Sequence, residues 1–237
     1  MRILVTNDDG LHAQQLIPLI RWARKLGEVT AFVPKVEQSG KSHSFNIKEP
    51  FEAVQVQLAP DITVWSVDSS PADCVRLAVL GMNMEFDLVL SGINRGLNVG
   101  ADIMYSGTVA AASEAVNLGI PAIALSTTPE NYPNATDNLD EIFALIEKLQ
   151  LLKKHNFYNI NIPKDAKGFC FTQQGGPYFS DDFLPEPGNM IRPRGKSVWI
   201  DSGRKELDTD ATLTGFISIS PLTINRTAWD VLGQLRG

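Results

Sequence analysis

Short apolar runs alternate with longer segments of helical spacing along the first half of the chain. The predicted strands lie at the very start of the chain and at residues 29–33, 64–67, 87–91 and 121–125. The predicted helices lie between them, at 16–26, at about 71–82 and at 106–118. Strands that alternate with helices form parallel sheets with helices packed on their faces. The sequence therefore predicts an α/β fold, a Rossmann-like parallel sheet in three layers.

The pattern is less regular in the second half of the chain. A helix is predicted at 137–152, and strands at 158–162, 169–172, 198–200 and 215–220. Residues 173–195 are rich in glycine and proline and are longer than an ordinary connection in a compact domain. Such a stretch suits either an oligomer arm or a plain surface excursion. We therefore predict one domain over 1–237, with a core at about 1–172 and an irregular, β-rich extension with a C-terminal segment at about 173–237.

Composition narrows the class of protein. At 237 residues, with 43% hydrophobic and 20% charged residues, the chain resembles an ordinary soluble globular protein. No apolar run approaches the roughly 18 residues of a membrane helix, and no signal peptide is visible, so the predicted compartment is the cytoplasm. The net charge of −6 argues against a non-specific nucleic-acid binder. Cys74 and Cys170 lie far apart and are expected to be buried thiols.

Two neighbouring carboxylates, Asp8 and Asp9, follow the first strand and precede Gly10. In open α/β sheets, ligands bind beyond the carboxyl ends of the strands. Side chains alternate along a strand, so the two carboxylates can converge on one ligand only where Gly10 breaks the strand. Two ionised carboxylates held together repel each other unless a cation offsets their charge, and oxygen ligands suit Mg²⁺, Mn²⁺ or Ca²⁺. The pair indicates either a divalent metal site or a helix cap, because Asp also caps helices well.

A polar loop at residues 38–44 follows the second strand and should open at the same edge of the sheet. Its hydroxyl groups and glycine, together with Lys41 and His43, are suited to approach an anion or to supply a proton. Serine and glycine also dominate ordinary turns, and a lone histidine in a polar loop is often structural or solvated. A functional role and a plain loop both stay open for this segment.

Two further loops follow later strands. Residues 91–100 contain three glycines and two asparagines, Asn94 and Asn98, which can offer amide groups to a phosphate or a metal. Their spacing is not that of a dinucleotide fingerprint. Residues 105–108 open a helix of small residues, whose N–H groups form an anion site unless Ser106 only caps the helix. Together with the carboxylates, these loops indicate a metal-assisted phosphate site.

Five blocks of the sequence resemble those of one known family. They are NDDG at 7–10, QSG and SHS within 38–44, PADCV at 71–75, SGINRGLNVG at 91–100 and YSGTVAAASEA at 105–115, with weaker echoes at 159–163, 209–210 and 215–222. The chain thereby resembles the SurE survival-protein phosphatases, also called 5′/3′-nucleotidases, over almost its whole length. The resemblance implies hydrolysis of nucleoside monophosphates to nucleoside and phosphate, with a small nucleotide as partner and neither duplex nucleic acid nor a membrane.

The resemblance also implies roles for individual residues. It assigns one divalent cation per subunit, Mn²⁺ or Mg²⁺ with Ca²⁺ as a third choice, to Asp8, Asp9, Ser39 and Asn94. It assigns the phosphate to Asn98, Ser106, Gly107 and Thr108. It implies homodimers or homotetramers that exchange their C-terminal parts, which would make the β-rich C-terminal extension at about 173–237 an oligomerisation extension. The chain departs from the family at 14–15, at 69–70 and in its short C-terminal tail.

The working hypothesis is phosphomonoester hydrolysis by a water molecule that the metal activates, with Asp9 as the catalytic residue. Asp9 either only binds the metal or also moves a proton, and His43 is a second candidate for proton transfer. Two rivals remain. One is a phosphatase that uses Asp8 as a covalent nucleophile. The other is a regulatory protein that binds nucleotides without turnover.

Overall fold

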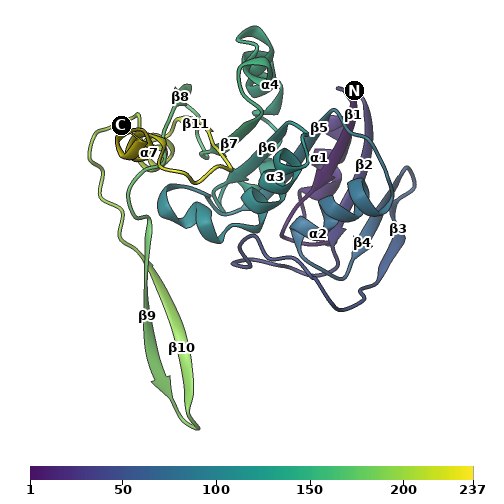
Figure 1. Ribbon diagram of the computed structural model, residues 1–237, viewed down its shortest axis with the longest axis horizontal. Coiled ribbons are helices and arrows are strands. Elements are labelled where there is room, and N and C mark those ends of the chain that lie inside the picture. The colour runs from purple at the N-terminus through teal and green to yellow at the C-terminus, as the bar shows by residue number, and fades with distance from the viewer. Residues whose placement is uncertain (237) are drawn as a thin grey trace.

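The computed structural model of the protein describes residues 1–236, which are built around a nine-stranded sheet (Figure 1). The strand order is β3-β4-β2-β1-β5-β6-β7-β11-β8. The strands are β1 (Arg2–Thr6), β2 (Glu28–Pro34), β3 (Ala53–Ala59), β4 (Ile62–Val67), β5 (Leu88–Arg95), β6 (Ala122–Thr127), β7 (Phe157–Ile162), β8 (Phe169–Phe171) and β11 (Ile217–Pro221). From β4 to β7 in this order all strands are parallel, whereas β3 and β11 pair antiparallel with β4 and β7. The predicted α/β fold is confirmed.

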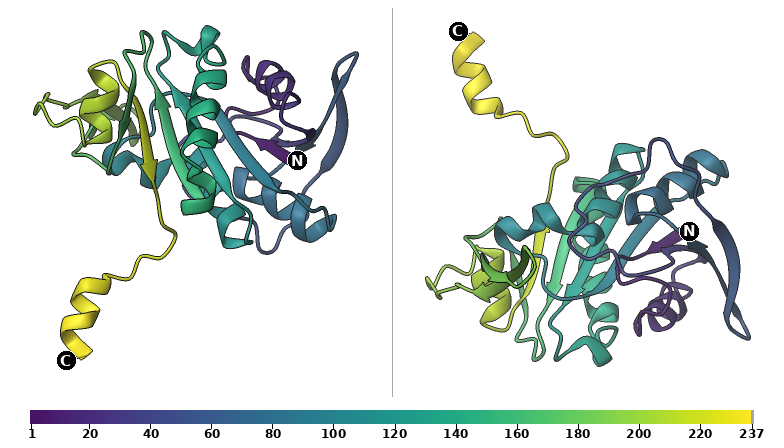
Figure 2. Two further views of the ribbon diagram at one scale, coloured as in Figure 1. Left: turned by 90° about the horizontal axis from the view of Figure 1, so that it is seen from above. Right: turned by 90° about the horizontal axis from the view of Figure 1, so that it is seen from below.

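Helices cover both faces of the sheet (Figure 2). They are α1 (Leu16–Ala23), α2 (Pro71–Arg76), α3 (Gly107–Asn117), α4 (Leu139–Lys148) and α5 (Leu151–Lys154), with a π-helical turn at Leu77–Gly81 and 3₁₀ turns at Gly100–Tyr105 and Tyr132–Asn134. Side chains of α1 and α4 share one apolar cluster with Ile3 and Val5. Those of α2 and α3 share a second cluster with Leu4. Successive side chains of β1 therefore face opposite layers, as the alternation along a strand requires.

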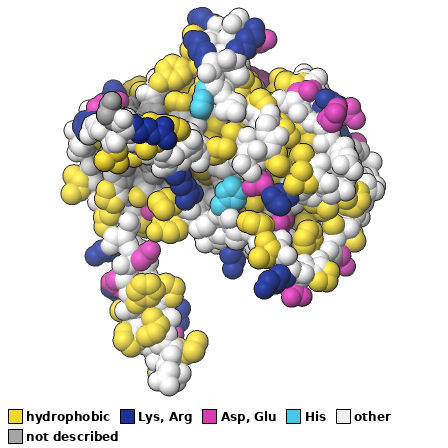
Figure 3. Space-filling view, viewed as in Figure 1, with side chains coloured by type: hydrophobic (Ala, Val, Ile, Leu, Met, Phe, Trp, Pro, Cys, Tyr) yellow, Lys and Arg dark blue, Asp and Glu magenta, His cyan; other side chains and the backbone are white. Residues whose placement is uncertain are grey.

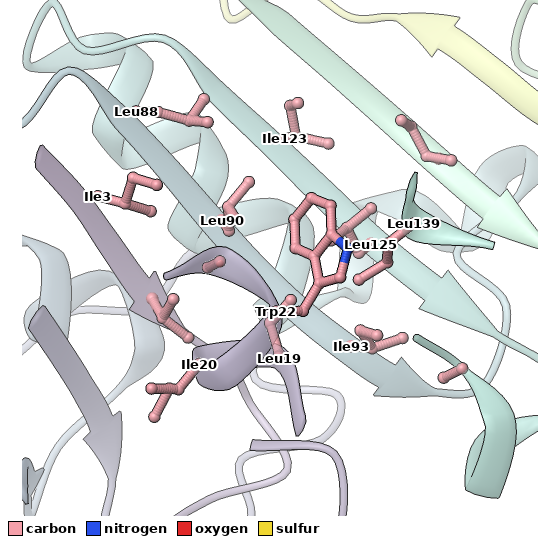
Figure 4. Packing of buried hydrophobic residues seen from close by; sticks show 14 of the residues in the cluster. Ile3, Leu19, Ile20, Trp22, Leu88, Leu90, Ile93, Ile123, Leu125 and Leu139 are labelled. Atoms are coloured by element: carbon pink, nitrogen blue, oxygen red, sulfur yellow. The ribbon is translucent and has the colours of Figure 1, made fainter. Parts of the chain in front are cut away.

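The layer on the α1 side is packed around Trp22 (Figure 4). Its indole ring lies among apolar side chains of the central strands. The ring also contacts Phe143 of α4, with centroids 4.5 Å apart, and its N–H donates to Asp140 at 2.7 Å. Each large apolar side chain buried in such a core stabilises the fold by about 2 kcal/mol. This packing fixes the strands whose carboxyl ends carry the polar loops.

The elements predicted for the core are present close to their predicted positions, although the helix predicted at 137–152 is divided into α4 and α5. β3 was not predicted from the sequence; it is an edge strand that pairs only with β4 within the described residues. The strand predicted at 198–200 is wrong. There the indole N–H of Trp199 donates to Asp210 and the chain has no regular structure. No helix within residues 1–236 is long and apolar enough to cross a membrane.

The stretch at 173–195 is largely a two-stranded hairpin, so the expected irregularity is wrong for most of it. The strands β9 (Phe179–Glu186) and β10 (Met190–Ser197) project from the body of the molecule (Figure 1). Gly188 and Asn189 have positive φ in the turn, as tight hairpins need. Pro185 and Pro193 are tolerated because every strand of a two-stranded ribbon is an edge strand.

Beyond the hairpin, the chain returns to the main sheet. Helix α6 (Asp208–Leu213) leads into β11, whose Ile217 and Ile219 are buried. Since β11 lies between β7 and β8, the sheet includes residues beyond 172, the limit predicted for the core. The last helix, α7 (Trp229–Arg236), buries none of its side chains and lies at the end of an extended arm (Figure 2).

Candidate functional site

The polar loops meet at the carboxyl edge of the sheet, where β1 lies between β2 and β5. The strand order changes direction at this point, which is the usual ligand site of an open α/β sheet. Gly10 turns the chain after β1 with a φ of +88°, and a Cβ atom there would lie 2.9 Å from the carbonyl carbon of Val36. The N–H of Gln38 donates to the carbonyl of Asp8 at 2.7 Å. The loop after β2 is thereby fixed against the loop after β1.

Asp8 is buried against the start of α3. One oxygen of its carboxylate accepts a hydrogen bond from the hydroxyl of Thr108. A Cβ atom on Gly107 would lie only 2.8 Å from the Cβ of Asp8, so this position needs glycine. Burial raises the pKa of Asp8, and the hydrogen bonds from Thr108 oppose that shift. The structure therefore brings Asp8, Gly107 and Thr108 together, and it uses the Thr108 hydroxyl on the carboxylate.

Asp9 is partly buried and receives two hydrogen bonds on one oxygen. The donors are the backbone N–H of Arg95 at 3.1 Å and the hydroxyl of Tyr132 at 3.2 Å. Burial, and next the negative charge of Asp8, raise the pKa of Asp9 to about 6. Tyr132 was not predicted from the sequence, because it follows β6 without a motif around it. The only available signal was its place in a loop after a parallel strand.

The other two predicted metal ligands lie on the loops beside the carboxylates. Asn94 immediately precedes Arg95, whose backbone N–H binds Asp9. The side-chain amide of Asn94 donates to the carbonyl of Gly96 at 2.9 Å. This bond leaves the amide oxygen of Asn94 for a ligand. Ser39 is exposed on the loop that is fixed to Asp8, and its hydroxyl donates to Glu37 at 2.7 Å. The structure brings the segments of all four residues to one edge of the sheet.

This set of donors fits a divalent cation that prefers oxygen. Two carboxylates, a hydroxyl and an amide oxygen are typical ligands of Mg²⁺, Mn²⁺ and Ca²⁺. The hydrogen bonds to Asp8 and Asp9 within residues 1–236 come from hydroxyl and backbone groups, and neither carboxylate pairs with a basic side chain there. The same residues include no group of three carboxylate, imidazole or thiol side chains suited to a metal. A cation here would therefore depend on Ser39 and Asn94 as well.

The amino terminus of α3 belongs to the same edge. Ser106 caps this helix by accepting a hydrogen bond from the N–H of Val109 at 3.0 Å. The cap satisfies only one of the free N–H groups of the first turn. The N–H groups of Gly107 and Thr108 act on the Asp8 carboxylate and lower its pKa. The positive end of the helix dipole suits an anion beside that carboxylate. Ser106 therefore has the capping role that the sequence left open, and the start of the helix is still suited to phosphate.

Asn98 is fixed by a buried network of amide groups. Its N–H donates to the side chain of Asn161 at 2.8 Å, and its carbonyl accepts from Asn159 and Asn161 at 2.8 and 2.9 Å. Its side-chain amide donates to the hydroxyl of Ser126 at 2.7 Å. These bonds give a role to the asparagines of β7, which the sequence analysis noted only as weak echoes. The backbone of Asn98 is thus positioned by the sheet itself.

His43 belongs to a cluster of charged side chains beside this edge. Its Nε2 lies 2.8 Å from the buried carboxylate of Glu114, which also accepts from Arg76 at 2.8 Å. The Arg76 guanidinium lies over the ring of Phe45, 5.0 Å from its centroid. His43 and Ser106 line one pocket of about 340 Å³. His43 is therefore an anchored residue that also borders the predicted phosphate site.

Fold and site together define an α/β protein with an acidic, oxygen-rich centre at the switch point of a parallel sheet, beside the amino terminus of a helix. Comparison with known proteins gives the family. The family described as Survival protein SurE matches residues 3–181. The chain belongs to the SurE family, and the resemblance seen in its sequence motifs is confirmed.

Individual relatives match over almost the full chain. It is 38% identical over 251 residues to the 5′-nucleotidase SurE of Gemmatimonas aurantiaca, covering 98% of this chain and 96% of the relative. It is 37% identical over 250 residues to the 5′-nucleotidase SurE of Marinobacter nauticus, covering 100% and 94%. A crystal structure of the SurE protein from Aquifex aeolicus matches with a TM-score of 0.77 and 29% identity, covering 100% of this chain and 98% of that one. The likeness therefore includes the hairpin and the C-terminal elements.

Proposed function

We propose that the protein is a metal-dependent phosphomonoesterase that hydrolyses nucleoside 5′-monophosphates, and also 3′-monophosphates, to nucleoside and phosphate. Membership of the SurE family and the name of the relatives, 5′-nucleotidase, support a hydrolase of nucleotide phosphomonoesters. The observation that carries the metal dependence is the pair Asp8 and Asp9, which lies beside the start of α3 and has no basic partner among residues 1–236. Paired acids next to an anion site suit a cation shared with a phosphate.

The metal ligands in this proposal are Asp8, Asp9, Ser39 and Asn94, which would bind one Mn²⁺ or Mg²⁺, with Ca²⁺ as a third choice. When bound, such a cation offsets phosphoryl charge and lowers the pKa of a water molecule. Thr108 orients Asp8 through its hydrogen bond. Tyr132 and the N–H of Arg95 occupy one oxygen of Asp9. The other oxygen of Asp9 is then available to orient the attacking water and to accept its proton.

The phosphate ligands in this proposal are Asn98, Ser106, Gly107 and Thr108. The N–H groups at the start of α3 would bind the phosphoryl oxygens, because the Thr108 hydroxyl is already used on Asp8. Fixed donors of this kind stabilise charge that develops in the transition state without reorganisation. The buried network around Asn98 provides that rigidity on the facing loop.

The covalent rival uses Asp8 as the nucleophile. A nucleophilic carboxylate needs an oxygen that reaches the phosphorus atom. The Asp8 side chain is buried and one of its oxygens binds Thr108, so a single oxygen is left for either the metal or the phosphorus atom. A phosphoaspartate at Asp8, trapped by acid quench and detected by mass spectrometry, would favour this rival over the metal-activated water.

The proposal is tested with Asp9→Ala and a matched control, Glu141→Ala, which removes an exposed carboxylate of α4. Phosphate release is measured with Mn²⁺ from nucleoside 5′- and 3′-monophosphates, polyphosphate and p-nitrophenyl phosphate. We expect the wild-type protein and the control to hydrolyse the nucleotides, and Asp9→Ala to lose at least roughly 1,000-fold in rate. Undiminished turnover by Asp9→Ala would contradict the proposal. Tight nucleotide binding by the wild-type protein without phosphate release would favour the regulatory rival.

We also propose that the protein assembles as a homodimer or homotetramer through its C-terminal part. Hydrophobic side chains gather on the projecting hairpin (Figure 3), where Phe183 and Met190 are 65% and 62% exposed. On α7, Trp229 and Leu235 are exposed as well. A second copy that covers these surfaces would remove them from water. Light scattering on the purified protein measures the mass, and a monomer at micromolar concentration would contradict the proposal.

The cytoplasm stays the predicted compartment.

A further inference from the structure

The buried carboxylate of Asp208 joins the base of the hairpin to the loop that follows Asn98. Asp208 is the first residue of α6 and is fully buried. Both of its oxygens accept from the N–H of Gly100, at 3.1 Å each. One of them also accepts from the N–H of Gly175 at 2.8 Å. Two distant loops therefore share one acceptor.

Further contacts join the same two segments. The side-chain amide of Gln174 donates to the carbonyl of Gly100 at 2.7 Å, and the N–H of Phe179 donates to Asp102 at 3.2 Å. Gly100 has a φ of +57°, and a Cβ atom there would lie 2.1 Å from the carbonyl oxygen of Gly176. The two backbones are in direct contact at this point. A shift of the hairpin base would therefore displace Gly100.

The loop is fixed from both sides. Asn161 of β7 binds the N–H and the carbonyl of Asn98, and Asp208 of α6 binds the N–H of Gly100 two residues later. We propose that Asp208 is a positioning residue for phosphate binding, which sets the place of Asn98 by joining Gly100 to the base of the hairpin. This inference rests on the proposed function, in which Asn98 binds the phosphate.

Asp210 provides a matched control on the same helix. It is also buried, and it accepts from the indole of Trp199 at 2.8 Å and from the N–H groups of Ser202 and Arg204 at 3.0 and 3.1 Å. These partners belong to the segment that leaves the hairpin. Asp210 therefore fixes the hairpin without a hydrogen bond to the loop of Asn98. Loss of either carboxylate should loosen the fold, but only loss of Asp208 should move the phosphate loop.

The experiment compares Asp208→Asn with Asp210→Asn. In Asp208→Asn, an NH₂ group replaces an oxygen and faces backbone N–H donors. The readouts are the inhibition constant of inorganic phosphate, KM and kcat for a nucleoside monophosphate, and Tm. We expect Asp208→Asn to raise the phosphate inhibition constant and KM together by roughly tenfold, with a smaller change in kcat. We expect Asp210→Asn to lower Tm and to change both constants by less than about twofold.

A gentler variant keeps the test decisive if Asp208→Asn does not fold. Gln174→Ala removes the bond to the Gly100 carbonyl and leaves Asp208 in place, and it should raise the phosphate inhibition constant by a few-fold. If phosphate inhibits the wild-type protein but both constants are unchanged in a folded Asp208 or Gln174 variant, this inference is overturned and the proposed function is not. Equal changes in Asp208→Asn and Asp210→Asn would also overturn it. No inhibition of the wild-type protein by phosphate would overturn the proposed function and this inference together.

Discussion

The carboxyl edge of the sheet and the C-terminal arm differ in whether their side chains find partners within the chain or face water. At the edge, Asp8 and Asn98 are buried, and their oxygens accept hydrogen bonds from the same chain. On the hairpin and α7, large apolar side chains face water, among them Phe183 and, with 79% exposure, Leu235. Most of the site is thus organised within one chain, whereas the arm presents a surface that another molecule can cover. Catalysis and assembly should therefore respond to different substitutions.

Replacement of Asp8 by Asn should give the largest effect on the edge. The variant keeps the shape of the side chain but loses a charged metal ligand, so phosphate release should fall at least roughly 1,000-fold. Thermal unfolding in chelator should be unchanged or shifted upward, because a buried carboxylate whose pKa is raised by burial is replaced by a neutral amide. Full activity, or a large fall in Tm, would show that Asp8 has a structural role only.

Replacement of Glu114 by Gln should give the next largest effect, on stability. The hydrogen bond from His43, and then that from Arg76, lower the pKa of Glu114. A lowered pKa means that the stabilisation is present above the unfolded pKa and is lost as the pH falls through the folded one. At pH 7 the variant should lose about 2–3 kcal/mol of unfolding free energy.

The pH dependence and a surface control make the Glu114 prediction specific. The difference between the variant and the wild-type protein should shrink below about pH 4, as the carboxylate of the wild-type protein becomes protonated. Glu52→Gln breaks the exposed pair with Lys35 and should change stability little. Urea unfolding at several pH values measures the unfolding free energies of both variants and of the wild-type protein. A deficit that does not change with pH would contradict the assigned cause.

Replacement of Tyr132 by Phe should give a smaller effect. Loss of the hydroxyl frees one oxygen of Asp9 to rotate, so Mn²⁺ affinity and kcat/KM should each fall by roughly three- to tenfold. The control is Tyr158→Phe, which removes a buried hydroxyl bonded to the carbonyl of Leu151. Calorimetric titration with Mn²⁺ gives the affinity. Equal losses in the two variants would assign the effect to general packing.

Substitutions on the hairpin should have the smallest effect on the folded chain. Phe183→Ser combined with Met190→Ser removes exposed apolar groups, so the unfolding free energy should change by less than about 0.5 kcal/mol. The mass measured by light scattering should nevertheless fall to that of a smaller assembly. An unchanged mass would show that the hairpin is not the contact between copies.

The sequence predicted the edge of the sheet better than its supporting contacts. Asp8, Asp9 and Gly10 are consecutive, and the loops at 91–100 and 105–108 each follow a strand or open a helix, so local patterns were sufficient. Tyr132 reaches Asp9 from 123 positions away, and Asp208 reaches Gly100 from 108 positions away. Neither carries a local motif, and only the folded topology brings them together. The periodicity of apolar residues does not identify single polar residues of this kind as part of a site.

The hairpin shows a different limit of sequence patterns. Its prolines and glycines indicate a loop by the usual rules, yet the residues pair over eight positions from Phe179 to Glu186. Both strands are almost entirely exposed, so no alternation of buried and polar residues marks them. β3 was missed because it is another edge strand with few buried side chains. Patterns of burial predict a strand only where one of its faces is covered by the same chain.

The most direct measurement is phosphate release from a nucleoside monophosphate by the wild-type protein before chelation, after removal of divalent ions, and after addition of Mn²⁺ or Mg²⁺. Because Asp8 and Asp9 are paired beside the start of α3 with no basic partner in the described part of the chain, we predict that chelation abolishes the release and that either ion restores it. Release that continues unchanged in the chelated protein would contradict a metal-dependent hydrolase at this edge of the sheet.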